Sequence, residues 1–468
     1  MSFVFYDTET TGVDTSFDQI LQFGAIRTDH DLNELERFEI RSQILPHIVP
    51  SPGAMRVTGV TVAQLTDTSL PTHYQMVAAI KAKLDEWSPA IFIGHNSLGF
   101  DEHLLRQAFF QNLHPPYLTN TNGNCRSDSL RILQAIALYE PGIITVPINE
   151  KGKPSFKLDQ LAPINGFADM DAHDAMGDVE AMIHMCKILA ENSDIHWSNF
   201  VRFAQKAAVS DFIQDEEVFS LTDFFYGKPY SWMVTTIGQN PNNGSESIVF
   251  NLSVDPGELI SLDDDELAKR LASQPKPVRS LRTNACPCIL AYDDAPDNLK
   301  AAGPDLDELE RRVSVLTSEE GFRERLVSAF LSTREDKEPS PHVEKQIYDG
   351  FSGNGDQALM TQFHSVEWGQ RFQLLDQFSD NRLKPLGERL IYAEASEAMP
   401  PEAKSNHEIM IAQRLMADDD SVPWLTLPKA IADTDDFLAM ATGDEAALLG
   451  DLRNYLADRA ERAASLIT

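Results

Sequence analysis

The sequence predicts an α/β protein whose mixed sheet is followed by a small β-rich region and then by a helical region. Three observations support this prediction. In roughly the first 190 residues, strand-like stretches come first and then alternate with helical ones. Residues 225–292 contain short strand-like stretches separated by turns rich in glycine, proline and asparagine. From Glu344 onward, apolar residues recur at helical spacing.

The first region contains the clearest secondary-structure patterns. The stretch 74–87 is typical of a helix, because Met76, Val77, Ile80 and Leu84 recur on one face. Strands that precede an alternation of helices and a further strand imply a mixed sheet. The predicted strands cover residues 3–7, 21–28, 37–44 and 90–94, and the predicted helices cover residues 74–87, 100–113, 127–139 and 174–190.

A chain of 468 residues exceeds the size of one ordinary hydrophobic core, so we expect several domains. The segments 295–304 and 332–341 are predicted to be connections, and the periodicity of residues 445–467 predicts a long helix. In the β-rich region the expected strands cover residues 232–237, 247–252 and 287–292. The predicted domains cover residues 1–192, 193–345 and 346–468.

The composition indicates a folded protein of the cytoplasm. Hydrophobic residues make up 42% of the chain and charged residues 24%, which is typical of globular proteins. No apolar run approaches the roughly 20 residues that cross a bilayer. Residues 1–7 lack the basic and apolar regions of a signal peptide. We therefore expect no contact with a membrane.

The four cysteines do not form a recognisable zinc motif. Cys286 and Cys288 are close in sequence, but no second Cys/His pair lies near them, and Cys125 and Cys186 stand alone. We expect reduced thiols, as in most cytosolic proteins.

The net charge of −33 is unusual for a protein that binds nucleic acid, because phosphate backbones favour basic surfaces. The acidic residues are spread over the whole chain, which indicates a solvated surface rather than a substrate preference. Two interpretations stay open for the one acid-free basic segment: a solvated face, or a contact surface for nucleic acid. This basic segment contains Lys269, Arg270, Lys276, Arg279 and Arg282.

A pair of carboxylates in the first predicted strand is the most informative local feature. Residues 7–12 read D-T-E-T-T-G, and alternation along a strand places Asp7 and Glu9 on the same side. Because neighbouring carboxylates repel each other, such a pair favours a divalent cation, and hard oxygen ligands suit Mg²⁺ or Mn²⁺. Taken alone, the motif is also compatible with a polar turn after an edge strand.

Two further motifs supply more acidic residues and a histidine. Asp101 begins a predicted helix, where an acid by itself also stabilises the helix dipole. Residues 173–178 read H-D-A-M-G-D, with the histidine just before a helix and the second aspartate in its first turns. Four carboxylates and a histidine are the components of a two-metal site for phosphodiester cleavage, in which the histidine accepts the proton of the attacking water. The predicted set is Asp7, Glu9, Asp101, Asp178 and His173.

The order of these motifs resembles a known class of nucleases. D-x-E, then N-x₄-D from Asn96, then H-x₄-D is similar to the pattern of the DEDDh 3′→5′ exonucleases, which have a ribonuclease H-like fold. The resemblance covers residues 3–190. It implies that the four carboxylates bind two Mg²⁺ ions, with Mn²⁺ as a substitute, and that His173 acts as the general base.

Further motifs are similar to those of the bacterial exonuclease I family. Residues 22–29 read Q-F-G-A-I-R-T-D, residues 52–61 read P-G-A-M-R-V-T-G-V-T, and residues 346–351 read Q-I-Y-D-G-F. The resemblance implies a nuclease domain, an SH3-like domain and a helical domain that enclose single-stranded DNA. It also implies a monomer that degrades single-stranded DNA to mononucleotides in DNA repair and recombination, beside single-stranded DNA-binding protein.

Residue by residue, the resemblance implies contacts with the substrate, first of all at Glu9. Lys157 lies where the family has arginine in a P-S-F-R-L stretch; the lysine keeps the positive charge but loses the bidentate contact to phosphate. Arg106 matches a DNA-contacting arginine, with a surface helix charge as the alternative. Tyr117 matches an aromatic residue that stacks on a base, or else covers the core. The loop 57–61 is expected near the terminal nucleotide.

Two other functions stay open. An RNA-trimming enzyme similar to ribonuclease T has the same chemistry, but such proteins are shorter, and the additional residues, about 270 of them, favour the DNA enzyme. The intact carboxylates argue against a non-catalytic nucleic-acid scaffold, because an inactive site has no need to hold like charges together. Dependence on Mg²⁺ separates the scaffold from the two enzymes.

Overall fold

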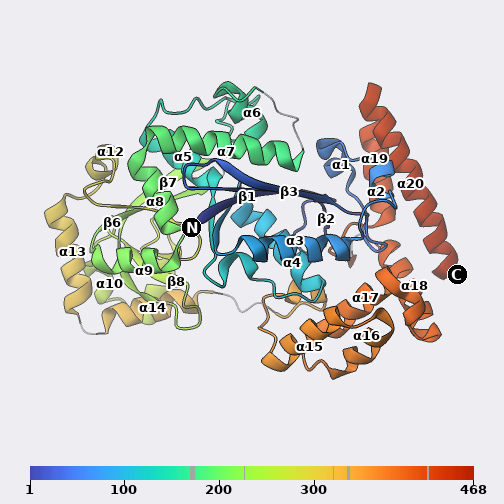
Figure 1. Cartoon of the computed structure of the whole chain (residues 1–468). Coiled ribbons are helices and arrows are strands. Elements are labelled where there is room, and N and C mark those ends of the chain that lie inside the picture. The colour runs from blue at the N-terminus through green and yellow to red at the C-terminus, as the bar shows by residue number, and fades with distance from the viewer. Residues whose placement is uncertain (169–173, 226, 320, 335–337, 419–420, 468) are drawn as a thin grey trace.

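A computed structural model describes residues 1–168, 174–225, 227–319, 321–334, 338–418 and 421–467. Figure 1 shows a central sheet with its helices, a β-rich middle part on one side of it, and the C-terminal helices on the other side and below. The chain passes through these three parts in order. The predicted succession of a mixed α/β region, a β-rich region and a helical region is therefore confirmed.

The sheet of the N-terminal part contains five strands in the order β3-β2-β1-β4-β5. The pairs β1–β2 and β2–β3 are antiparallel, whereas β1–β4 and β4–β5 are parallel, so the predicted mixed sheet is confirmed. The strands are Ser2–Thr10 (β1), Ile20–Thr28 (β2), Glu34–Arg41 (β3), Ala90–Gly94 (β4) and Cys125–Asp128 (β5).

Two details of this sheet differ from the prediction. Strand β3 ends before residues 43 and 44, because the amides of Gln43 and Ile44 donate to the carbonyls of Pro71 and Leu65 outside the sheet. Strand β5 is not predicted, since the helical pattern of residues 127–139 extends into it. The helix begins only at Ser129. The side chain of its N-cap residue, Asp128, accepts a hydrogen bond from the Leu130 amide.

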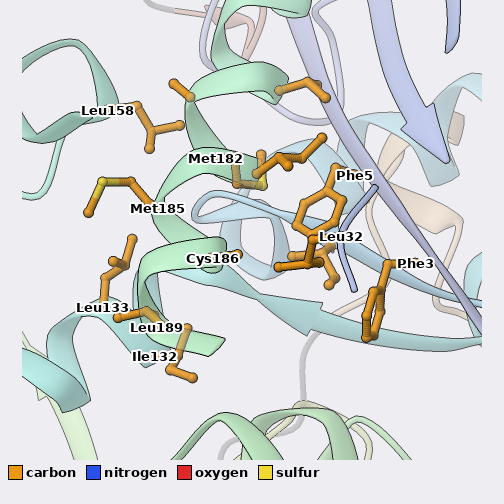
Figure 2. Close-up of a cluster of buried hydrophobic side chains, with 14 of the residues drawn as sticks. Phe3, Phe5, Leu32, Ile132, Leu133, Leu158, Met182, Met185, Cys186 and Leu189 are labelled. Carbon is orange, nitrogen blue, oxygen red and sulfur yellow. The ribbon is translucent and has the colours of Figure 1, made fainter. Parts of the chain in front are cut away.

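One face of β1 packs against two helices. Phe3 and Phe5 belong to the same buried cluster as side chains of α5 (Ser129–Tyr139) and α7 (Ala175–Asn192). Figure 2 shows Phe5 beside Met182 of α7 in this cluster. Burial of each such side chain contributes about 1.5–3 kcal/mol. The apolar contacts therefore hold α7 firmly against β1.

The opposite face of β1 packs against two other helices. Val4 and Tyr6 belong to a second buried cluster with α3 (His73–Trp87) and α4 (Asp101–Gln111). Because the side chains of a strand alternate between faces, Asp7 continues the row of Phe3 and Phe5 toward α7. The core therefore packs against both faces of β1, and Asp7 and Glu9 follow at the end of the strand.

Shorter helices complete the N-terminal part. Phe200 of α8 packs in the same cluster as Phe3, so α8 extends this core beyond α7. The shorter helices are α1 (Pro52–Thr58), α2 (Val62–Leu65), α6 (Leu158–Ile164) and α8 (Asp194–Phe203), with 3₁₀ turns at Ser97–Gly99 and Leu118–Asn120.

The middle part contains a second sheet, antiparallel throughout, in the order β10-β6-β7-β8-β9. The three predicted strands are confirmed, while β6 and β9 are additional. The sequence of β9 reads V-R-S-L-R, and its two arginines belong to the basic segment, so the local pattern does not predict a strand. The strands are Phe219–Phe225 (β6), Lys228–Gln239 (β7), Glu246–Asn251 (β8), Val278–Arg282 (β9) and Cys288–Ala291 (β10).

Helices that the sequence analysis does not predict cover this second sheet. Leu309 and Val313 of α13 and Leu326 of α14 pack with Phe250 of β8 in one buried cluster. The segment 295–304, predicted to be a connection, contains the short helix α12. The helices are α9 (Lys206–Asp215), α10 (Gly257–Ile260), α11 (Asp264–Ala272), α12 (Asp297–Ala301), α13 (Leu306–Ser318) and α14 (Phe322–Ser332).

The regular secondary structure described in the C-terminal part consists of helices and 3₁₀ turns, as predicted. Two buried clusters join this part to the N-terminal part: Leu452 and Leu456 pack with Met55 of α1, and Phe363 packs with Phe110 of α4. The helices are α15 (Asn354–Ser365), α16 (Trp368–Leu374), α17 (Leu383–Ala395), α18 (Pro401–Leu415), α19 (Leu427–Leu438) and α20 (Gly443–Ile467), with 3₁₀ turns at Val343–Gln346, Leu375–Gln377 and Ser396–Ala398.

Two sequence-based expectations concern the chain as a whole. The domain limits 1–192, 193–345 and 346–468 stay a prediction. Among the residues that the structure describes, no helix is both long enough and apolar enough to cross a bilayer.

Candidate active site

Three of the predicted carboxylates converge at the end of β1. Oxygen atoms of Asp7, Glu9 and Asp178 all lie within 4.8 Å of one another. The first two come from β1 and the third from the first turn of α7. Three oxygen ligands at this spacing are able to share one divalent cation.

A close contact between strand and helix brings Asp178 to β1. At Gly24 of β2, an added Cβ would lie 3.0 Å from the backbone carbon of Ala175 and 3.0 Å from the nitrogen of Met176. Only a residue without a side chain lets the start of α7 approach the sheet this closely. The Asp178 amide then donates to the Asp174 carbonyl at 3.1 Å in the first helical turn.

Asp101 reaches the site from the other face of the sheet. It is the first residue of α4, it is 4% exposed, and its Oδ1 accepts a hydrogen bond of 2.6 Å from the Thr8 hydroxyl. The turn before it is fixed by Asp128, which accepts the amides of Asn96 at 2.8 Å and Leu98 at 3.1 Å. These bonds set the position from which α4 begins.

Burial and mutual repulsion raise the pKa values of these carboxyl groups. For Asp7, burial is the largest cause, followed by the charges of Asp101, Asp178 and Glu9, and its pKa lies well above the usual value. Burial, with the charges of Asp178 and Asp101, raises the pKa of Glu9 to about 8. Burial raises the pKa of Asp101 to about 6. A divalent cation relieves this repulsion, and the all-oxygen donor set fits Mg²⁺ or Mn²⁺.

His173 lies outside the described residues. Its neighbour Asp174 is described, and the carboxylate of Asp174 accepts hydrogen bonds from Gln22 of β2 at 2.6 Å and from Arg41 of β3 at 2.7 Å. The sequence analysis does not single out Gln22, Arg41 or Asp174. Gln22 and Asp174 do lie in quoted motifs, whereas Arg41 has no sequence signal, because only the pairing of β2 with β3 brings it here.

A cavity of about 590 Å³ opens over the carboxylates. Lys157, which is exposed and precedes α6, lines this cavity. The backbone beside it is held in place, since the Phe156 carbonyl lies 2.8 Å from His95 Nε2. Gly227, in the turn between β6 and β7, also lines the cavity, so the middle part of the chain reaches the site.

Arg106 and Tyr117 lie together but do not line this cavity. The Arg106 guanidinium is 5.1 Å from the centre of the Tyr117 ring, and its Nε donates to Glu102 at 2.8 Å. Arg106 is 9% exposed, so it is not the surface charge that was the alternative. Tyr117 is half-buried, and the exposed ring of Phe351 stands edge-on to it at 5.5 Å.

The loop 57–61 ends α1 and begins α2. Val57 is 57% exposed, while Met55 on the same helix is buried against the C-terminal part. Arg56 binds Glu445 of α20 at 2.5 Å and stacks over the Phe437 ring at 4.4 Å. The C-terminal helices therefore support the segment that the family pattern expects near the terminal nucleotide.

Family models match the three parts of the chain in order. Residues 4–185 match the model described as Exonuclease, residues 205–332 match the Exonuclease I SH3-like domain, and residues 341–459 match the Exonuclease I C-terminal domain. Among curated relatives, exodeoxyribonuclease I of Escherichia coli is 28% identical and the match covers 77% of this chain and 78% of the relative. Exodeoxyribonuclease I of Haemophilus influenzae is 27% identical, with coverage of 78% and 80%.

Solved structures of similar proteins have the same fold. Exonuclease I from Methylocaldum szegediense superimposes with a TM-score of 0.84 at 24% identity, and E. coli exonuclease I in complex with a dA16 oligonucleotide with 0.82 at 24%. Each comparison covers 98% of this chain and 99% of the other. The predicted architecture of an exonuclease domain with a mixed sheet, an SH3-like domain and a helical domain is thereby confirmed. Because three successive family models account for most of the chain and two of them are specific to one family, the chain belongs to the exonuclease I family.

Proposed function

We propose that this chain is a 3′→5′ exodeoxyribonuclease that hydrolyses single-stranded DNA from its end and releases mononucleotides. The convergence of Asp7, Glu9 and Asp178 within 4.8 Å carries the proposal, because it gathers hard oxygen ligands beside a cavity of about 590 Å³. The family models over all three parts and the curated relatives named exodeoxyribonuclease I support it.

Membership of the exonuclease family implies dependence on a divalent metal. We propose Mg²⁺, two ions per site, with Mn²⁺ as a substitute. When bound, such ions activate the attacking water and stabilise the leaving oxygen. The chain's own contribution is to hold four carboxylates in place before the ions arrive: Asp7 and Glu9 from β1, Asp178 from α7 and Asp101 from α4.

We propose His173 as the general base that accepts the proton of the attacking water. Its place five residues before Asp178 follows the family pattern, and a neutral imidazole near physiological pH is suited to this role. The hydrogen bonds that Asp174 accepts from Gln22 and Arg41 support the proposal, because they hold the next residue of the chain beside Glu9.

Lys157 is the proposed phosphate contact inside the cavity. Lys157 is exposed and lines the cavity over the carboxylates, where a point charge attracts a backbone phosphate without fixing its orientation. Glu9 is proposed to contact the terminal nucleotide as well as metal. We propose that Tyr117 stacks on a base and that Arg106, whose guanidinium lies 5.1 Å from the centre of the Tyr117 ring, contacts the DNA beside it.

The middle part, which lines the cavity at Gly227, also has a row of aromatic side chains on β6 and β7. Phe225 and Tyr230, which are 48% and 45% exposed, pack at 5.7 Å, and the Tyr230 ring stacks nearly parallel to Trp232 at 6.3 Å. The Arg279 guanidinium lies 3.5 Å from the centre of the Trp232 ring. We propose that bases stack along this aromatic row while Arg279 attracts phosphates.

Other parts of the proposal rest on the family pattern alone. We propose that the chain acts as a monomer in the cytoplasm, in DNA repair and recombination, and beside single-stranded DNA-binding protein. Sedimentation of the purified chain alone and with that protein tests the oligomeric state and the partnership separately.

Hydrolysis of end-labelled substrates tests the function directly. We expect the chain to shorten single-stranded DNA from the 3′ end in Mg²⁺, to leave duplex DNA largely intact, and to do nothing in EDTA. Faster cleavage of RNA than of DNA would instead support the RNA-trimming enzyme. Binding of single-stranded DNA without cleavage in either Mg²⁺ or Mn²⁺ would support the scaffold.

A further inference from the structure

A row of side chains crosses the first sheet at the level of the carboxylates. Glu9 on β1 lies opposite Gln22 on β2, and Gln22 lies opposite Arg41 on β3. Directly opposed residues in antiparallel strands project to the same face of the sheet. The row therefore begins at the metal-binding face and ends at the edge strand, on the face that the start of α7 covers.

Asp174 connects this row to α7. Its Oδ1 accepts a hydrogen bond of 2.6 Å from Gln22 Nε2 and one of 2.7 Å from Arg41 Nη2. Asp174 is the N-cap residue of α7, yet its side chain makes no capping hydrogen bond. An aspartate at this position normally accepts an amide of the first helical turn. Here the carboxylate binds the sheet instead.

Glu39 joins the same two donors and closes the network. Gln22 Nε2 donates to Glu39 Oε1 at 2.9 Å, and Arg41 Nε lies 3.4 Å from the same oxygen. The side chains of Arg41 and Asp174 are only 34% and 31% exposed, so water screens their attraction less than that of a fully exposed pair. The network is thus more than a surface contact between two mobile side chains.

We propose that Arg41 is a positioning residue for the nuclease site: by holding Asp174 it sets the start of α7, and with it the placement of Asp178. The Asp178 amide donates to the Asp174 carbonyl at 3.1 Å, so the two residues belong to the same helical turn. Arg41 is not a catalytic residue, since it acts through Asp174. The inference rests on the proposed nuclease function.

Arg37 provides a matched control on the same strand. Its Nη1 binds Glu180 Oε1 at 3.0 Å, so it also joins β3 to α7, but further along the helix than Asp178. Arg37→Met and Arg41→Met each remove one arginine and one salt bridge between the same two elements. Both variants are expected to have similar melting temperatures.

The two variants should differ in turnover. We expect Arg41→Met to lower kcat on single-stranded DNA about 10–100-fold, the usual effect of losing a group that orients a metal-site residue. KM, and the Kd for single-stranded DNA in EDTA, should not change. Arg37→Met should keep the kcat of the unmodified chain, and Arg41→Lys should recover part of the loss.

A second measurement does not depend on activity. Amide hydrogen exchange over residues 175–180 should become faster in Arg41→Met and stay unchanged in Arg37→Met. Asp174→Asn should lower kcat like Arg41→Met, and the double variant should lose little more, because both changes remove the same contact.

Several results would overturn the inference. Unchanged kcat and exchange in Arg41→Met would show that the contact positions nothing. A raised Kd with a reduced salt slope would make Arg41 a phosphate contact instead. If the unmodified chain fails to cleave single-stranded DNA in Mg²⁺, the proposed function fails, whereas the exchange experiment still decides whether Arg41 sets the start of α7.

Discussion

Thr8 Oγ1 donates a hydrogen bond of 2.6 Å to Asp101 Oδ1, and this bond joins the strand that carries Asp7 and Glu9 to the helix that carries Asp101. It lowers the pKa of Asp101 against the larger effect of burial, which raises that pKa to about 6. We expect Thr8→Val to raise this pKa further in the metal-free protein, so Mg²⁺ should bind more weakly to the variant than to the unmodified chain at acidic pH. Thr8→Ser keeps the hydroxyl and should behave like the unmodified chain. Equal Mg²⁺ affinity of Thr8→Val and the unmodified chain at every pH would show that the bond does not affect Asp101.

Asp7→Ala and Asp178→Ala should abolish cleavage but leave DNA binding largely intact. Each change removes a metal ligand and few phosphate contacts, and loss of one electrostatic element of a transition-state clamp costs about 10²–10³ in rate. The checks are turnover in Mg²⁺ and Kd for single-stranded DNA in EDTA. Near-normal cleavage by either variant would contradict the metal assignment.

His173→Ala should lower kcat with little effect on affinity for single-stranded DNA. If His173 accepts a proton, kcat of the unmodified chain should rise with pH through the histidine titration and then level off. The measurement is a pH–rate profile between about 5.5 and 8 under single-turnover conditions. A flat profile with chemistry limiting would assign the proton transfer to another group.

Neutralising Lys276, Arg279 and Arg282 together should weaken binding to long single strands. The salt slope should fall by about 0.7 for each phosphate that the variant no longer neutralises. Cleavage of a very short oligonucleotide, held only near the carboxylates, should change little. Changing Lys269 and Arg270 to glutamine is the control, because these residues lie on α11 and Arg270 bonds to the Pro275 carbonyl at 2.9 Å. Equal losses for short and long substrates would indicate a folding defect instead of a DNA path.

Acid should loosen the contact between the N-terminal and C-terminal parts. The His114 ring stacks on His364 at 3.9 Å, and burial together with the charge of His364 lowers the pKa of His114 to about 2. Between that value and about 6.5 the unfolded chain binds more protons than the folded one, so stability is present above pH 6.5 and is lost as pH falls. On acidification to pH 5, the melting temperature of His114→Phe should therefore fall less than that of the unmodified chain. Replacing the exposed His30 with glutamine is the control, and equal acid sensitivity in all three proteins would contradict this account.

Much of the fold was predictable from local patterns. The continuous apolar run at the start of β1 reflects burial of both faces of that strand, and the 3.6-residue periodicity of α3 and α7 reflects burial of one face of each helix. Asp7 and Glu9 could be placed on the same side of one strand because side chains alternate between its two faces. Local patterns do not reveal strand β9, because three of its five residues are Arg279, Ser280 and Arg282, and pairing with β8 rather than composition makes it a strand.

The sequence by itself predicted Asp7, Glu9 and Asp178, whose carboxylate oxygens the fold brings within 4.8 Å of one another, because carboxylates in this order carry their chemistry in residue type and spacing. The tertiary structure alone decided that Gly24 admits the start of α7 and that Arg41 faces Asp174 across a strand. These contacts join residues far apart in the chain. Strand register and helix packing set them, and neither is visible in a local pattern.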